Sequence, residues 1–194
     1  MRNLNHKRFP AIKWAEPSIM AALQLRRDAG IDAGEIERIE VFTFATASEL
    51  AITVPKSAEE AQYSLVFPLS VAIVHGDIRG GHLDGAGLDD PNVLRLSRAT
   101  AIHHDPAYDP KYPAEQTARV RFHLRDGRTM DSQPYVMPGA QEPLRVDEAV
   151  AKLHASGADV ASPHHLERME RALVALKDAQ DLADLDCLFE PISR

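Results

Sequence analysis

Cysteine is almost absent from this sequence, and the scarcity excludes two kinds of structure. The single one, Cys187, has no partner for an internal disulfide bond. A lone thiol also argues against a metal centre built from several thiolates. We therefore expect Cys187 to be a small buried hydrophobic residue.

Long hydrophobic runs and an excess of basic charge are missing as well. The longest apolar stretch, Leu65 to Val74, is too short to cross a membrane, which takes about 20 residues, and the amino terminus lacks a signal-type apolar run. The formal net charge of -7 argues against nucleic acid, which proteins bind through basic surfaces. These absences predict a cytoplasmic protein with neither a membrane nor a nucleic-acid partner.

The composition is that of a protein with a hydrophobic core. Hydrophobic residues make up 44% of the chain and charged residues 26%, both ordinary for a soluble globular fold. The residue pattern predicts helices over 17–29, 58–74, 90–100, 146–155 and 163–185, and strands near 36–44, 101–104, 116–125 and 128–136. This order indicates an α+β fold: a small, helix-covered, mainly antiparallel sheet followed by a carboxy-terminal helix.

Two local signals refine this outline. Ser57 followed by Glu60 has the pattern of a helix amino-terminal cap, and Pro68 should interrupt the helix after it, so that two helical pieces meet near Phe67. Asp126-Gly127 has the composition of a two-residue hairpin turn.

Several short motifs occur in an order that resembles a known family. They are Lys7-Arg8-Phe9-Pro10-Ala11 before an alanine-rich helix, then 36–41, 60–65 through His75-Gly76, 90–93, the Asp126-Gly127 turn, and Pro138-Gly139 to Pro143. Their order and spacing resemble the lid domain of MmgE/PrpD proteins. The resemblance covers nearly the whole chain, from Lys7 to the final helix.

The resemblance implies both a fold and an activity. Family members act on small di- or tricarboxylates, by dehydration of 2-methylcitrate, decarboxylation of cis-aconitate or epimerisation of iminodisuccinate, and this chemistry needs no cofactor or metal. Their fold joins a helical large domain, built from the amino-terminal half, to an α/β lid and a returning carboxy-terminal helix. We therefore expect residues 1–160 to form the lid domain and 161–194 the helix and tail that pack on a helical domain lacking here.

The resemblance also points to candidate site residues. Removing a proton next to a carboxylate requires a base, cations that hold carboxylates, and exclusion of water. Lys7 aligns with a lysine of the family's active-site cleft and would bind a substrate carboxylate or assist proton transfer, while Ser64 and Phe67 would contact substrate. The alternative for Lys7 is a solvated lysine beside His6 and Arg8.

Two departures from the family pattern argue against standard dehydratase chemistry. The family commonly has Ser-Leu-Pro-Tyr where this chain has 64–67, Ser-Leu-Val-Phe, so Phe67 brings no hydroxyl to donate a hydrogen bond. A histidine often found shortly after the Phe-Pro motif is also absent, and the residues near that place are Ile12, Lys13, Trp14 and Glu16.

Two other groups of polar residues have simpler interpretations. His103-His104 with Asp105, and His164-His165, contain common metal-ligand types, but neighbouring side chains on a strand point to opposite faces, so we expect no metal site. Arg119, Arg121 and Arg125 alternate with apolar residues. They could bind an anionic substrate, but such a stripe is more often the solvated face of a hairpin, and we favour that interpretation.

Two functions of different classes remain open from the sequence. In the first, the chain is the lid of an enzyme, pairs with a separately encoded helical subunit and is inactive alone. In the second, it is a non-catalytic binding or interaction module that keeps the lid fold. Without a partner, we expect a homodimer formed through an apolar stripe of the last helix, consisting of Leu166, Met169, Leu173 and Leu176.

Overall fold

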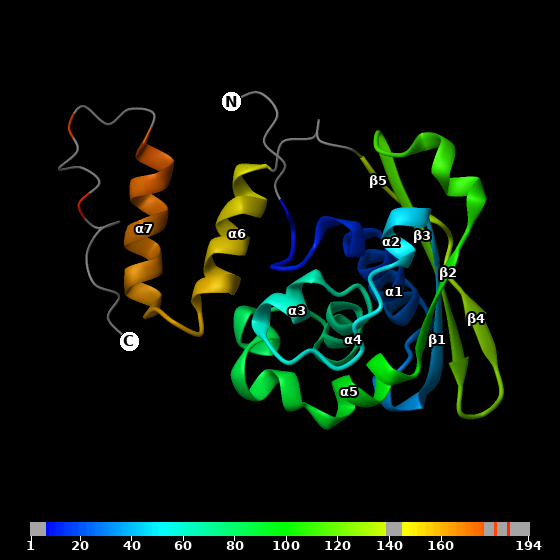
Figure 1. Ribbon diagram of the computed structural model, residues 1–194. Coiled ribbons are helices and arrows are strands. Elements are labelled where there is room, and N and C mark those ends of the chain that lie inside the picture. The colour runs from blue at the N-terminus through cyan, green and yellow to red at the C-terminus, as the bar shows by residue number, and fades with distance from the viewer. Residues whose placement is uncertain (1–6, 139–144, 177–180, 182–185, 187–194) are drawn as a thin grey trace. The chain divides into compact units, whose positions relative to one another are not determined.

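A computed structural model describes residues 7–138, 145–176, 181 and 186 (Figure 1). The chain divides into two compact units, Met1–Pro143 and Leu144–Arg194, which are described separately below. Cys187, residues 139–143 of the predicted linker, and most of the predicted end of the last helix lie outside the described residues.

The first unit is built on a five-stranded mixed sheet. Its strands are β1 (Ile36–Thr43), β2 (Thr100–His104), β3 (Glu115–Leu124), β4 (Thr129–Asp131) and β5 (Tyr135–Pro138), in the order β2-β1-β3-β4, with β5 also paired to β3. β1 is parallel to β2, whereas the other pairings are antiparallel. The predicted α+β class and mainly antiparallel sheet are confirmed.

The predicted hairpin strand at 128–136 is two short strands rather than one. At the interruption, Ser132 donates its N–H to the carbonyl of Val120 at 2.8 Å, and its hydroxyl accepts the N–H of Val120 at 2.9 Å. Pro134 follows and has no N–H to give to a ladder. Where the strand breaks, the Ser132 hydroxyl therefore accepts the N–H of Val120 in place of a backbone carbonyl.

Helices cover one face of this sheet. The α-helices are α1 (Glu16–Ala29), α2 (Ala45–Ser48), α3 (Ala58–Tyr63), α4 (Val66–His75) and α5 (Pro91–Arg98), and short 3-10 turns occupy Lys13–Ala15, Ala33–Glu35, Gly80–Leu83, Gly85–Asp89 and Pro106–Lys111. Figure 1 shows α1 and α4 beside the sheet, and α1 contacts both β3 and α4. α1 ends at Gly30, whose φ of 64° suits glycine.

The break between α3 and α4 is not where Pro68 suggested. Ser57 caps α3 as predicted, accepting the N–H of Glu60 at 3.2 Å. The helices separate at Ser64-Leu65, and Pro68 is the third residue of α4. The two predicted helical pieces are therefore confirmed, but they meet at Ser64-Leu65, before Phe67. Pro68 fits into the first turn of α4 because the N–H that proline lacks is not used there by a helix.

In its described residues, the second unit contains two helices, α6 (Val146–Gly157) and α7 (Pro163–Ala175). Leu166 is buried, and a Cβ added to Gly157 would lie 2.4 Å from it, so the two helices pack closely there. Further along α7 the stripe is uncovered, with Leu173 45% and Leu176 50% exposed. The expected boundary between residues 160 and 161 falls in the connection between the two helices. None of the described helices is long and apolar enough to cross a membrane.

Candidate functional site at the Lys7 segment

The Lys7 segment, residues 7–12, lies against the end of α3. The N–H of Ile12 donates to the carbonyl of Gln62 at 2.7 Å, two residues before Ser64. Within the segment Phe9 and Ala11 are buried in the core, whereas Lys7 and Arg8 are exposed. The structure thus joins the two stretches of chain that carry the predicted site residues.

The buried carboxyl group of Glu16 binds the backbone of the Lys7 segment. Glu16, the first residue of α1, is fully buried, and its Oε1 accepts the N–H of Arg8 at 2.6 Å and that of Phe9 at 3.4 Å. Its other oxygen, Oε2, has no hydrogen-bond partner among the described residues. This burial could not be predicted from the sequence, because a glutamate in the first turn of a helix usually faces solvent.

Burial raises the pKa of Glu16 above its ordinary value of 4.5. The amides of Arg8 and Phe9, and then the charges of Lys13 and Arg8, act in the opposite direction. Because the folded-state pKa is the higher one, the proton on Glu16 stabilises the fold fully below the unfolded pKa. That contribution is lost as the pH rises through the folded pKa.

Ser64 and Phe67 lie in the interior of the α3–α4 junction. The Ser64 hydroxyl donates to the carbonyl of Ile52 at 2.7 Å and accepts the N–H of Phe67 at 3.1 Å. Both residues are fully buried, so in this conformation they hold the junction together.

Large apolar side chains are exposed beside this junction. Tyr63 is 64% exposed, and Ile52 and Val54 also present much of their surface to solvent. Ile52 adjoins Ser64 through the hydrogen bond just described. Tyr63 places an aromatic hydroxyl beside this junction. Its exposure could be seen only from the fold, because it depends on α3 ending at this residue.

Aromatic packing fixes the chain between the Lys7 segment and α1. Trp14 contacts Phe44 and Tyr112 edge to face, with ring centroids 6.4 and 6.3 Å apart. Trp14 is the sole tryptophan of the sequence, so its fluorescence reports on this part of the first unit.

A second polar cluster lies on the sheet. His123 Nε2 is hydrogen-bonded to Glu40 Oε2 at 2.6 Å, and this bond holds the pKa of Glu40 below its usual range. His103 Nε2 lies 3.3 Å from Glu40 Oε1, an ion-pair distance without hydrogen-bond geometry. His104 points away and pairs with Asp109 at 2.7 Å. Adjacent histidines therefore serve opposite faces, as expected, and in the described part of the chain no three His, Cys, Asp or Glu residues form a group that could hold a metal ion.

The arginine stripe is tied to its own sheet. Arg119 and Arg121 both pair with Asp131, and the Arg119 guanidinium lies 4.0 Å from the centroid of the Phe42 ring. Arg125 donates to the carbonyl of Gly34 at 2.9 Å. Alternating buried and half-buried residues along β3 confirm that the stripe is the outer face of the hairpin.

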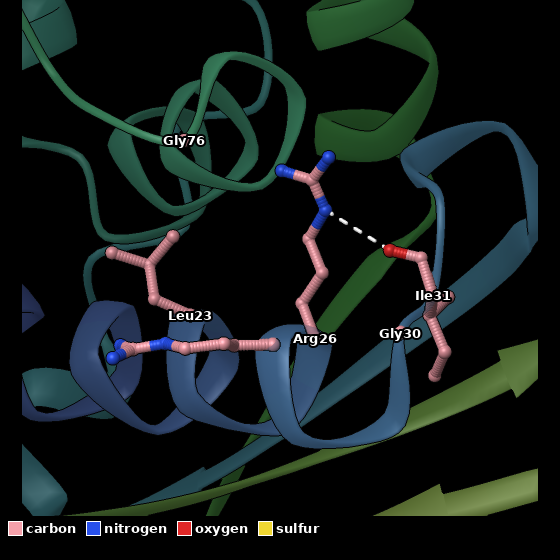
Figure 2. A pocket seen from close by; sticks show the side chains of 6 residues that line it. Leu23, Arg26, Gly30, Ile31 and Gly76 are labelled. Carbon is pink, nitrogen blue, oxygen red and sulfur yellow. Dashed lines mark hydrogen bonds between the residues drawn. The ribbon is translucent and has the colours of Figure 1, made fainter.

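A hollow of about 470 Å³ lies elsewhere, beside Leu23, Arg26, Arg27, Gly30, Ile31 and Gly76 (Figure 2). Arg26 donates there to the carbonyls of Ile31 at 3.1 Å and Ile73 at 2.6 Å, which occupies two of its nitrogens. The hollow adjoins the carboxyl end of α1, whereas the Lys7 segment adjoins its amino end, about 20 Å away along the helix. We therefore assign the hollow no part in the candidate site.

The family model described as the MmgE/PrpD C-terminal domain matches residues 9–178. None of the curated proteins matches the chain.

Proposed function

The chain belongs to the MmgE/PrpD family, and we propose that it is the lid part of an enzyme acting on small di- or tricarboxylates. The reaction moves a proton at a carbon next to a carboxylate: dehydration and epimerisation remove it, whereas decarboxylation delivers one after CO₂ is lost. The observation that carries this proposal is the placement of Lys7, exposed on a segment that is fixed by Glu16 and by the end of α3.

Lys7 is the proposed functional cation. An exposed ammonium group can hold a substrate carboxylate or take part in proton transfer, and a rigid backbone beneath it limits the positions that it samples. Ser64 and Phe67 are proposed to contact substrate as well. Because both are buried, that contact requires the α3–α4 junction to open when substrate binds.

A helical part of the enzyme, proposed here as a separate subunit in the cytoplasm, would supply the general base and most substrate contacts. Two features support a covering partner. Ile52, Val54 and Tyr63 expose apolar surface near the α3–α4 junction of the first unit. Leu173 and Leu176 expose apolar surface on the second unit. Exposed apolar surface of this kind favours association.

The test is the turnover of 2-methylcitrate and cis-aconitate by the chain combined with its helical part. Lys7→Ala should lower kcat/KM by more than about tenfold, because an interaction with the reacting carboxylate is lost. Lys56→Ala is the matched control, since Lys56 is an exposed lysine outside the segment. Unchanged kcat/KM for Lys7→Ala would leave Lys7 a solvated lysine.

The alternative, a non-catalytic interaction module, is favoured by one observation. Phe67 has no hydroxyl and lies in the core, so the position offers no polar group to a substrate. Complete inactivity on both carboxylates in the presence of the helical part, with tight binding between the two parts, would favour this alternative.

A further inference from the structure

Burying the carboxyl group of Glu16 costs free energy, and core packing alone does not require a carboxyl group at this position. Glu16 is fully buried, as are Ala11, Ala15 and Ile19 nearby in the sequence, and one of its carboxyl oxygens has no hydrogen-bond partner among the described residues. An apolar side chain at such a position usually gives equal or greater stability. A role in holding a neighbouring group would explain why the carboxyl is there.

The hydrogen bonds of Glu16 identify that group. Its Oε1 accepts the N–H groups of Arg8 and Phe9, which belong to the two peptide bonds on either side of Arg8. The first of these bonds carries the carbonyl carbon of Lys7. Fixing both peptide planes therefore fixes the position of the Lys7 Cα, the atom from which its side chain leaves the backbone.

We propose that Glu16 is the positioning residue of Lys7: its carboxyl holds the backbone at Arg8 and Phe9 so that the Lys7 ammonium is presented to a substrate carboxylate. This inference rests on the function proposed for Lys7. Burial favours the neutral carboxyl and raises the pKa of Glu16, whereas the two amides and the charges of Lys13 and Arg8 act in the opposite direction. In either form Oε1 keeps lone pairs that accept the two amides.

The first experiment measures the anchor itself, because trypsin cleaves the same two peptide bonds that Glu16 holds. Cleavage of the folded chain after Lys7 and Arg8 is followed by mass spectrometry and normalised to cleavage after Arg128, beside the exposed Asp126-Gly127 turn. Glu16→Ala should accelerate cleavage at both bonds by about tenfold or more, since both hydrogen bonds to the buried carboxyl are lost and the segment opens more often.

Two further variants make this result specific. Glu16→Gln keeps an oxygen that can accept both amides, so cleavage should stay within about threefold of the unmutated chain. Glu35→Ala is the matched control, because Glu35 Oε2 accepts the N–H of Asp32 at 2.8 Å on an exposed turn away from the segment, and it should leave cleavage after Lys7 unchanged. If Glu16→Ala fails to fold, Glu16→Asp, one methylene shorter, should show the same acceleration. Wild-type cleavage rates in the folded Ala or Asp variant would overturn the inference.

The second experiment connects the anchor to function, using turnover of 2-methylcitrate or cis-aconitate by the chain with its helical part. Glu16→Ala should lower kcat by about tenfold or more, because small displacements of a reacting group are costly, and Glu16→Gln should recover most of the loss. If Lys7→Ala lowers activity and Glu16→Ala does not, the positioning role is wrong while the proposed function stands. If Lys7→Ala has no effect, the proposed function of Lys7 fails, and the positioning role fails with it.

Discussion

Replacing Ser64 with alanine tests whether this residue holds the α3–α4 junction. Its hydroxyl satisfies two backbone groups, the carbonyl of Ile52 and the N–H of Phe67. The two losses are unequal. Ile52 is partly exposed, so its carbonyl can turn to water, whereas Phe67 is fully buried and its N–H cannot.

The N–H of Phe67, left without an acceptor, determines how much stability Ser64→Ala loses. A buried donor left without an acceptor costs about 1–3 kcal/mol, and loss of a serine at the start of a helix costs about 0.5–2 kcal/mol. Because these describe the same hydrogen bond, we expect Ser64→Ala to lower the free energy of unfolding by about 2 kcal/mol in total. For a chain of this size that corresponds to a Tm lower by about 4–8 °C.

Fluorescence of Trp14 during urea unfolding is the assay, because Trp14 belongs to the same unit as Ser64. Ser48→Ala is the matched control: Ser48 also donates to a backbone carbonyl, that of Ala45 at 2.6 Å, but from a partly exposed position. Its change should stay within about 0.5 kcal/mol. A Ser64→Ala change equally small would refute the reasoning that the hydroxyl is a structural part of the junction.

Three further predictions concern pH, activity and assembly. As the pH rises above about 4.5, the ordinary pKa of this carboxyl, the unmutated chain loses the stability that the proton on Glu16 contributes, whereas Glu16→Gln does not. The free energy of unfolding of Glu16→Gln relative to the unmutated chain should therefore rise with pH, and a constant difference in urea titrations would contradict this. The chain alone should not turn over 2-methylcitrate or cis-aconitate, and measurable product would disprove the need for a helical part. Light scattering of the chain alone should show a homodimer that Leu173→Glu shifts towards monomer, and a monomeric unmutated chain would rule out this interface.

Local sequence signals predicted much of the fold because each depends on a few adjacent residues. Gly30 ends α1 and Gly127, with φ of 87°, lies in the hairpin turn, since both adopt backbone conformations that glycine favours. The parallel pairing of β1 with β2 had no such local signal. It joins strands more than fifty residues apart, and pairing direction depends on the path of the chain between them.

The candidate site was less accessible to sequence reasoning. Lys7 could be identified by its place in the motif order, but the burial of Ser64 and the anchoring role of Glu16 depend on contacts made after folding. A serine and a glutamate are mostly exposed residue types, so composition alone predicts the wrong environment for both. Only the hydrogen bonds in the structure distinguish a polar side chain that holds the backbone from one that is available to bind a ligand.

The central claim, proton removal next to a carboxylate with Lys7 taking part, is tested most directly by proton nuclear magnetic resonance in D₂O. The chain and its helical part are incubated with 2-methylcitrate, cis-aconitate or iminodisuccinate, and deuterium incorporation at carbons beside a carboxylate is followed. Epimerisation and decarboxylation both deliver a solvent proton to carbon and therefore introduce deuterium, whereas dehydration removes the proton and is followed by loss of the substrate's C–H signal. The account predicts one of these changes for at least one of the compounds, at a rate lowered more than about tenfold by Lys7→Ala. Neither deuterium incorporation nor loss of a C–H signal with any of them in a folded, associated complex would contradict it.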